Sequence, residues 1–279
     1  ATIMASSTFV CYIVGQEAKN HIRSRYIGTF LHFQDRLIEN GVPEDRIHVV
    51  NGQYTSEEDG FSEKNAPRDA GDRFKGSTWP KGRTHFCTSW PGTALQRCRW
   101  EVQELLQRET VEGETPILLI YDGHGGRDPS IIVDGVPIKP SDVVAWFSDI
   151  GRLQNPCLAI WNQCFSGRMA EETCKLAQAP LWPHAFISST TAQLSAESDG
   201  LTSGAKLFLC LAEAQKRLAL AQPRFKDLQE LWETDLSAQY ATRTKGLQAV
   251  FGGTTTQIWD WKLAHFGLMP ISSALAPRG

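Results

Sequence analysis

The fold of this chain is decided by two stretches, Leu118-Leu119-Ile120-Tyr121-Asp122-Gly123-His124-Gly125-Gly126 and Leu158-Ala159-Ile160-Trp161-Asn162-Gln163-Cys164-Phe165-Ser166-Gly167. Each begins as an apolar run typical of a buried strand and stops at a reactive side chain, first His124 and then Cys164. In an open α/β sheet, ligands bind beyond the carboxyl ends of parallel strands. If the two strands are neighbours, an imidazole and a thiol meet there, and such a thiol is an activated nucleophile. The two stretches therefore predict the catalytic dyad of a cysteine hydrolase.

The composition predicts a globular protein without a nucleic-acid partner and without a membrane span. The 279 residues are 41% hydrophobic, enough for one large core, and the formal net charge is −3. The sequence has no basic stripe interleaved with aromatic residues, so no nucleic-acid partner is expected. No apolar run reaches the roughly 18 to 20 residues that cross a bilayer. No acidic cluster has the spacing of a calcium loop, and we expect no metal and no cofactor.

The cysteines predict a reducing compartment. Seven are present, an odd number without a Cys-x-x-Cys pair, which argues against a disulfide framework or a zinc ribbon. A cytoplasmic location is therefore expected. Cys11, Cys157 and Cys210 lie in apolar runs and are expected to be buried small hydrophobes, whereas Cys164 stands at a strand end.

Strand and helix patterns alternate along the chain. We expect strands at 9–14, 46–50, 116–121, 156–162, 184–188 and 247–259, and helices at 29–39, 93–108, 140–150, 167–178, 204–221 and 224–244. A small hairpin is expected around Asp134-Gly135. This alternation predicts an α/β protein: a three-layer α/β/α sandwich with a mostly parallel six-stranded sheet, as one domain over residues 1–279. Residues 51–92 break the pattern, as a long loop near the active-site face or as a disordered segment would.

Several motifs taken together resemble the caspase–legumain clan of cysteine peptidases. In that clan His-Gly follows one strand, and a pattern like acid or amide-x-Cys-x-Ser-Gly follows the next, as Asn162 to Gly167 do here. Arg25 before a helix, the turn from Asn40 to Val50, and Tyr121 to Gly126 are similar to the legumain and GPI-transamidase branch. The resemblance covers residues 9 to 259, except 51–92.

The resemblance implies a caspase–hemoglobinase-like fold and an endopeptidase that works through a thioester acyl-enzyme. Cys164 would attack the scissile carbonyl, and His124 would act as general base and then protonate the leaving amine. The backbone N–H groups of Gly125 and Cys164 would bind the oxyanion, each worth about 2.7–4 kcal/mol of barrier. A helix beginning near Gly167 would favour the thiolate.

The sequence specifies the residues of the substrate pocket less closely than those of the catalytic dyad. The resemblance assigns to it Arg25, Asn162, Ser189, Ser195, Glu197 and Asp199. Arg25 with the neutral amide of Asn162 favours Asp or Asn before the scissile bond. If Glu197 or Asp199 points inward, a basic or amide side chain is favoured instead.

The sequence does not provide a clear third catalytic residue beside His124 and Cys164. Asp122 is expected to face away from Tyr121 and Gly123 on the strand, so it is not assigned as a third catalytic residue. Where the legumain branch has an Asn that orients the histidine, this sequence has Arg23.

The same motifs are compatible with activities other than peptide hydrolysis. The partner would be a peptide or protein substrate, with self-processing within 51–92, and the same acyl-enzyme opened by an amine would make the protein a transpeptidase or ligase. A catalytically silent scaffold is the alternative from a different class. A phosphate loop at Gly123 to Gly126 is disfavoured, because the Lys-Ser/Thr pair of such loops is missing.

Overall fold

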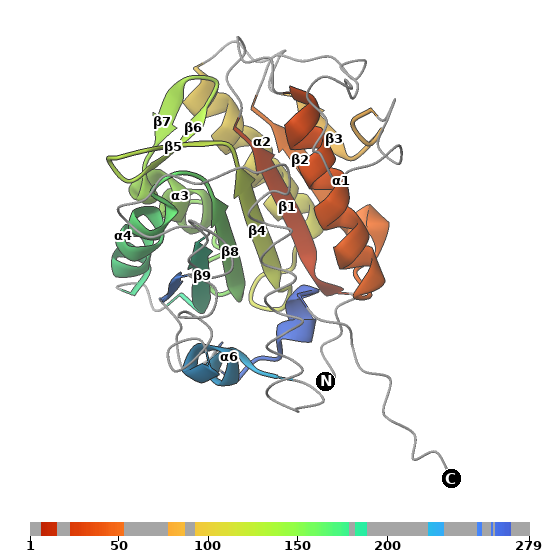
Figure 1. Ribbon diagram of the computed structural model, residues 1–279, viewed down its shortest axis with the longest axis vertical. Helices are drawn as coiled ribbons and strands as arrows, with labels where there is room; N and C mark the ends of the chain where they lie inside the picture. The colour runs from red at the N-terminus through yellow and green to blue at the C-terminus, as the bar shows by residue number, and fades with distance from the viewer. Residues whose placement is uncertain are drawn as a thin grey trace.

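The computed structural model describes residues 7–15, 23–52, 78–86, 93–178, 182–188, 223–231, 250–252, 258 and 260–268 of the chain. Within these residues the chain forms a large sheet, a small sheet, and helices on both faces of the large sheet (Figure 1). The small sheet lies at one end of the large sheet and helix α6 (Phe225–Leu231) lies at the other.

The described residues give the large sheet seven strands in the order β10-β9-β8-β4-β1-β2-β3. Six of them run parallel, and β10 is antiparallel to β9. The strands are β1 (Phe9–Val14), β2 (Ile47–Asn51), β3 (Thr84–Phe86), β4 (Ile117–Asp122), β8 (Cys157–Asn162), β9 (His184–Ser188) and β10 (Val250–Gly252). Every residue of β1, β2, β4, β8 and β9 is buried, as expected for parallel strands covered on both faces.

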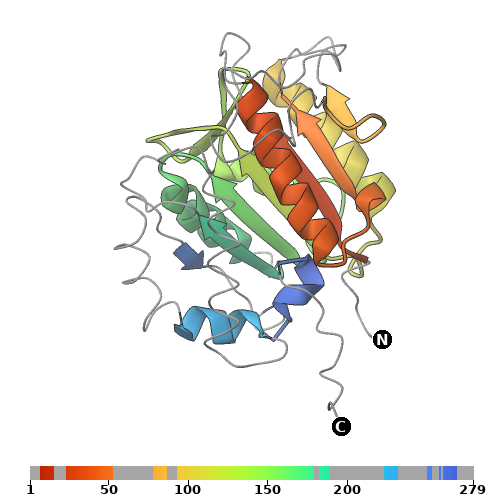
Figure 2. The same cartoon turned by 45° about the vertical axis from the view of Figure 1, so that its right-hand side comes forward.

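Helix α1 (Arg23–Glu39) covers one face of the sheet. It buries Ile27, Phe30, Phe33 and Leu37, which follow one stripe of the helix, against alternate residues of the strands such as Tyr12. The rings of Phe30 and Phe33 meet that of Tyr12 edge to face, at centroid distances of 5.1 and 5.7 Å. Figure 2 shows α1 lying across β1 and β2.

The other face is covered by α2 (Ala94–Glu109), α3 (Pro140–Ser148) and α4 (Ser166–Gln178). Their apolar side chains form a second core with the opposite set of strand residues. The sequence sets two of the helix starts. Thr93 and Gln96 form a reciprocal capping box before α2, and Pro140 opens α3 where the Lys139 N–H donates to Asp142.

A three-stranded antiparallel sheet stands at the end of β4. It consists of β5 (His124–Gly126), β6 (Ser130–Val133) and β7 (Val136–Ile138). Asp134 and Gly135 connect β6 to β7 with φ of 49° and 75°, the left-handed conformation of a two-residue hairpin turn. The expected hairpin is confirmed, and it takes β5 as a third strand.

The segments before β4 and before β8 are joined by one buried side chain. The Asn155 amide donates to the carbonyl oxygens of Val111 and Thr115 at 2.8 and 2.9 Å, and its Oδ1 accepts from the Gly113 N–H at 3.0 Å. These bonds satisfy backbone groups that burial would otherwise leave unpaired. They tie together the starts of the two strands that precede His124 and Cys164.

The described residues of the segment 51–92 include an element that the sequence analysis missed. Strand β3 extends the sheet beyond β2, where Arg83 donates to the Ile47 carbonyl and to Gln34, each at 2.8 Å. The prediction that this whole segment lacks regular structure is therefore wrong for Thr84–Phe86.

The carboxyl-terminal part packs near the start of the sheet. The short helix η7 (Leu263–Phe266) adds Leu263 and Phe266 to the α1 core, and the Asn40 amide donates to the Gly267 carbonyl at 2.7 Å. Another short helix, η2 (Glu44–Arg46), precedes β2. Strand β10 ends at Gly252, and Ile258, the next described residue, is helical, so the expected strand through 259 is wrong at Ile258. The expected helix at 204–221 lies outside the described residues.

The predicted class is confirmed: an α/β sandwich of three layers around a mostly parallel sheet. The six expected strands form, and β3 makes a seventh at the edge.

Candidate active site

His124 and Cys164 lie just beyond the carboxyl ends of two neighbouring strands. β4 and β8 pair in parallel, with Asp122 opposite Asn162. His124 follows Asp122 by two residues, and Cys164 follows Asn162 by two. The backbone therefore brings the imidazole-bearing and thiol-bearing residues to the same height at the same edge of the sheet, where α/β proteins bind ligands. Both residues are half-buried.

Gly125 packs directly against the cysteine segment. A Cβ atom at this position would lie 2.2 Å from the carbonyl oxygen of Cys164 and 2.4 Å from Cγ of Gln163. Only glycine allows the two segments to approach so closely. The backbone after the histidine and the backbone at the cysteine are therefore in contact, as a shared oxyanion site requires.

The turn after Cys164 is strained and leads straight into a helix. Phe165 adopts φ of 56°, which is costly for a residue with a side chain, and α4 begins at Ser166. The thirteen-residue helix α4 thus has its amino-terminal end at the cysteine, where its dipole favours an anion. Arg127 spans the two loops: its guanidinium lies 5.9 Å from the centroid of the Phe165 ring, and its carbonyl accepts from Arg168 at 3.4 Å.

Cys164 differs from the other cysteines in the described part of the chain. Cys11, Cys98, Cys157 and Cys174 are buried, and Cys164 is partly exposed. Burial raises the pKa of Cys11 and of Cys174 to about 12, and it raises the pKa of Cys157 well above the usual range. These three are inert structural thiols, as a buried apolar environment makes them. The expectation for Cys11 and Cys157 is confirmed, and Cys210 lies outside the described residues.

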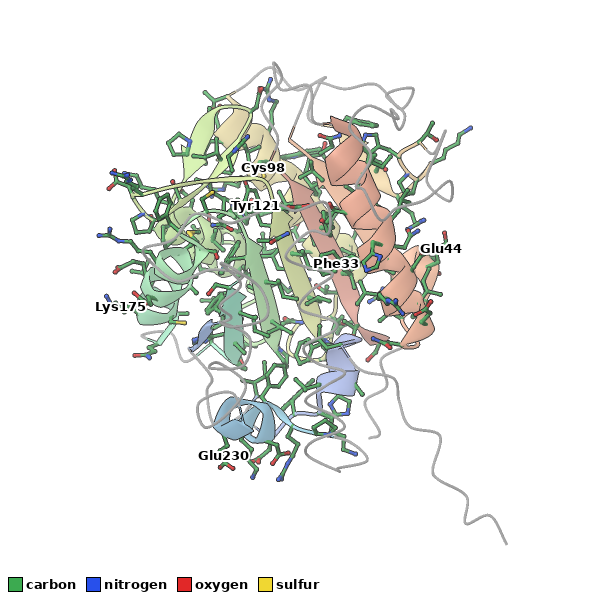
Figure 3. All side chains as sticks on the ribbon, in the orientation of Figure 1. Phe33, Glu44, Cys98, Tyr121, Lys175 and Glu230 are labelled. Carbon is green, nitrogen blue, oxygen red and sulfur yellow. The ribbon has the colours of Figure 1, made fainter. Side chains whose placement is uncertain are left out.

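A buried tyrosine supports the histidine loop from the α2 side. The Tyr121 hydroxyl lies 2.7 Å from the carbonyl oxygen of His124 and 2.7 Å from that of Ile132, and the Ile132 N–H donates to it at 3.1 Å. His124 is also the register partner of Ile132 between β5 and β6. Figure 3 labels Tyr121 near the end of β4, beside the small sheet. The residue thus joins the histidine backbone to β6, a link that sequence patterns did not indicate.

Asp122 and Asn162 form a buried polar pair on the α1 side of the dyad. The Asn162 amide donates to the Asp122 carboxylate at 3.1 Å, and the Tyr12 hydroxyl donates to the same carboxylate at 2.9 Å. Asp122 and Asn162 are each 5% exposed. Asp122 thus faces away from Tyr121, as expected from strand alternation. The pair was identifiable in the sequence, because each member precedes a reactive residue by two positions.

The other residues assigned to the substrate pocket are described only in part. Arg25 lies in the first turn of α1, which follows the carboxyl end of β1 in the chain, and its side chain is outside the described residues. Arg23, the first residue of α1, is in the same situation. Ser189, Ser195, Glu197 and Asp199 lie outside the described residues.

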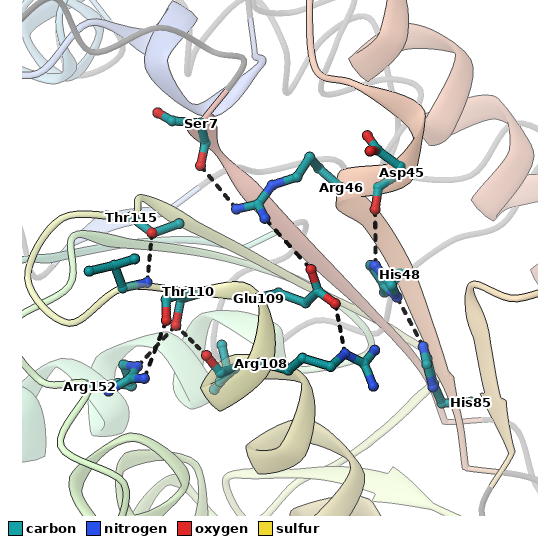
Figure 4. Close-up of polar contacts among 12 residues, drawn as sticks. Ser7, Asp45, Arg46, His48, His85, Arg108, Glu109, Thr110, Thr115 and Arg152 are labelled. Carbon is teal, nitrogen blue, oxygen red and sulfur yellow. Dashed lines mark hydrogen bonds and ion pairs between the residues drawn. The ribbon is translucent and has the colours of Figure 1, made fainter.

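A second titratable cluster lies away from the dyad, near the amino-terminal ends of β1 and β2 (Figure 4). His48 Nδ1 is 3.0 Å from His85 Nε2, and His48 Nε2 is 3.1 Å from the Asp45 carbonyl. That carbonyl can only accept, so His48 carries its proton on Nε2 and receives one from His85. Burial lowers the pKa of His48, and burial together with the neighbouring His48 lowers the pKa of His85 to about 4. Both imidazoles are therefore neutral at physiological pH.

The described residues contain neither a group of metal-ligating side chains nor a helix that could span a membrane. Among them, no three His, Cys, Asp or Glu side chains are grouped closely enough to hold a metal ion. None of the helices in the same part of the chain has the length and apolar character needed to cross a bilayer.

Comparison with known proteins shows the fold. No protein-family model and no curated protein matches the sequence. Among solved structures, the fold is similar to that of caspase-1 from Spodoptera frugiperda, with a TM-score of 0.50 and 11% identity over 92% of this chain and 90% of that chain. The chain therefore has a caspase-like fold.

Proposed function

We propose that this protein is a cysteine endopeptidase in which Cys164 is the nucleophile and His124 the general base. The observation that supports the proposal is the parallel pairing of β4 with β8, whose paired last residues, Asp122 and Asn162, each lie two positions before His124 and Cys164. The caspase-like fold supports the same assignment, since the caspase–legumain clan carries its dyad at these strand ends.

The local chemistry fits acyl transfer. Cys164 is the partly exposed thiol among the described cysteines, and it lies at the amino-terminal end of α4. In the proposed reaction His124 takes the thiol proton, the Cys164 sulfur attacks the scissile carbonyl carbon, and the C–N bond then breaks. The leaving amine takes its proton from His124. Water, activated by the same imidazole, then hydrolyses the thioester and restores the thiol.

The backbone at Gly125 supplies the oxyanion site in this proposal. The close approach of Gly125 to the carbonyl oxygen of Cys164 supports a shared site formed by the N–H groups of both residues. A preorganised donor of this kind lowers the barrier by about 2.7–4 kcal/mol.

The experiment is cleavage of a fluorogenic peptide library by the purified full chain. We expect Cys164→Ala and His124→Ala each to lower kcat/KM by about 1,000-fold or more, since each removes a partner that acts as a unit with the other. Cys174→Ala, which alters a buried thiol within α4, the helix that follows Cys164, is the matched control and should retain wild-type activity once its fold is verified by circular dichroism. Full activity in Cys164→Ala would refute the proposal.

A catalytically silent scaffold is the second candidate function. It predicts that no peptide in the library is cleaved and that Cys164 reacts with peptidyl electrophiles no faster than a free thiol. Transpeptidation by the same acyl-enzyme would instead show as a ligated product when an amine nucleophile is added.

A further inference from the structure

Two arginines lie close in the chain to the residues of the proposed dyad. Arg127 lies in the turn between β5 and β6, three residues after His124, and Arg168 lies in the first turn of α4, four residues after Cys164. Both arginines are exposed, so a ligand can reach them from solvent.

Contacts between the two segments hold the arginines beside the cysteine. The Arg127 guanidinium lies 5.9 Å from the centroid of the Phe165 ring. Arg168 donates from Nη1 to the Arg127 carbonyl at 3.4 Å, and its backbone N–H donates to the Phe165 carbonyl at 3.1 Å. Because Phe165 directly follows Cys164, these contacts place both cations where the turn after the histidine meets the cysteine segment. We call Arg127 and Arg168 the arginine pair.

Within the described residues, neither member of the arginine pair forms an ion pair with a carboxylate. Asp128, next to Arg127 in the turn, is likewise not ion-paired in this part of the chain. One turn further along α4, Glu172 bonds to Lys175 at 2.9 Å. A guanidinium has five N–H donors, and Arg168 uses one of them on the Arg127 carbonyl. The arginine pair is therefore an exposed cationic patch with donors for an anionic ligand.

The proposed mechanism indicates which half of a substrate passes the arginine pair. The acyl half becomes bonded to Cys164, whereas the leaving amine takes its proton from His124. The residues after the scissile bond therefore extend from the side of His124. Arg127 lies in the turn to which β5 leads from His124, so these residues pass beside it.

We infer that Arg127 and Arg168 are specificity-determining residues that favour Asp or Glu among the first residues after the scissile bond. The inference rests on the proposed function and concerns the leaving half of the substrate. A carboxylate there forms charge-assisted hydrogen bonds with a guanidinium, whereas a lysine or arginine meets like charges. Opposite charges also raise the rate at which an acidic peptide and the protein associate.

The test is a set of internally quenched peptides that share the residues before the scissile bond and differ in the three residues after it. These three are all glutamate, all glutamine or all lysine. The wild-type chain should cleave the glutamate peptide with a kcat/KM about 3- to 10-fold above that of the glutamine peptide, and the lysine peptide least well. Added salt should reduce this preference, because exposed charges are screened.

Substitution of the arginine pair should remove the preference. In the double variant Arg127→Gln with Arg168→Gln, the glutamate and glutamine peptides should be cleaved with equal kcat/KM. In Arg127→Glu the ranking should shift toward the lysine peptide. Lys175→Gln is the matched control: it removes an exposed cation from α4 about 10 Å beyond Arg168 and should keep the wild-type ranking.

Coumarin amides with the same acyl half distinguish substrate recognition from support of the two segments. They carry no amino acid after the scissile bond, so every variant of the arginine pair should cleave them with the wild-type kcat/KM. If coumarin hydrolysis fell as much as cleavage of the glutamate peptide, the arginine pair would act through the position of the dyad, and the inference would be overturned.

The inference and the proposed function fail in different ways. Equal kcat/KM for the three peptides in the wild-type chain would overturn the role of the arginine pair and leave the cysteine peptidase standing. Absence of cleavage of every substrate, with Cys164 unreactive toward peptidyl electrophiles, would overturn the proposed function and the inference with it. If the double variant does not fold, the wild-type ranking and its salt dependence decide the inference.

Discussion

At the scale of single residues, the candidate site depends on side chains at the same offset from two strand ends. The position of His124 and Cys164 after strand ends was predictable, because the sequence shows apolar runs that stop at a reactive residue near glycine or serine. The support around them was not. The Tyr121 hydroxyl meets the His124 carbonyl and also the carbonyl of Ile132 in β6, and no local pattern specifies which backbone groups a hydroxyl will reach.

Tyr121 is a positioning residue in this account, and its loss should lower the rate of the chemical step. We expect Tyr121→Phe to reduce kcat by about 10- to 100-fold with KM nearly unchanged, since a small displacement of the general base is enough for such a loss. Steady-state kinetics with the preferred peptide measure this split.

A matched control separates positioning from general destabilisation. Thr173→Val removes another buried hydroxyl, which donates to the Met169 carbonyl at 2.6 Å within α4. Each variant should unfold at lower temperature, because each loses buried hydrogen bonding worth about 1 kcal/mol or more. An equal fall in kcat for both variants would show that Tyr121 acts only through stability.

At the scale of elements, helices and strands were predictable where an apolar pattern extends over several residues. The strands at Phe9–Val14 and Cys157–Asn162 are continuous apolar runs, and the hairpin follows from Asp134-Gly135. Strand β3 was missed because three residues are too few to show an alternating pattern. Its place in the sheet comes from pairing with β2. An edge strand of this length is defined by tertiary contacts, which no local propensity encodes.

The partly buried pair of His48 on β2 and His85 on β3 should make the protein less stable in mild acid. The pKa of His85 is about 4 in the folded chain and about 6.5 in an unfolded one, so the unfolded state binds more protons between these values. The stabilisation is complete above about pH 6.5 and is lost as the pH falls toward 4. Thermal unfolding across this range should show Tm falling with pH.

Replacing His85 isolates its contribution to the fall in stability at low pH. In His85→Gln the fall in Tm between pH 6.5 and 4 should be smaller than in the wild type, with the remainder due to other buried groups such as His184, whose pKa burial also lowers. Parallel curves for the two proteins would contradict the assignment of the acid sensitivity to His85.

At the scale of the whole molecule, the decisive fact is the order of strands. Strand, helix and strand spacings predicted a mostly parallel three-layer sandwich, and that class is confirmed. The sequence did not determine that β4 and β8 are neighbours, since local patterns carry no information on order within a sheet. The fold is shared with a caspase at 11% identity, which shows how few side chains a buried parallel sheet prescribes.

The proposed mechanism requires the imidazole of His124 and the thiol of Cys164 to act as one unit. Alkylation of Cys164 by iodoacetamide between pH 5 and 9, followed by peptide mass spectrometry, measures this without any assumption about substrate. We predict that wild-type Cys164 reacts faster at pH 6.5 than a free thiol, which ionises near about pH 8.5, and that His124→Ala abolishes the advantage. Identical profiles for wild type and variant, both following a free thiol, would contradict the central claim.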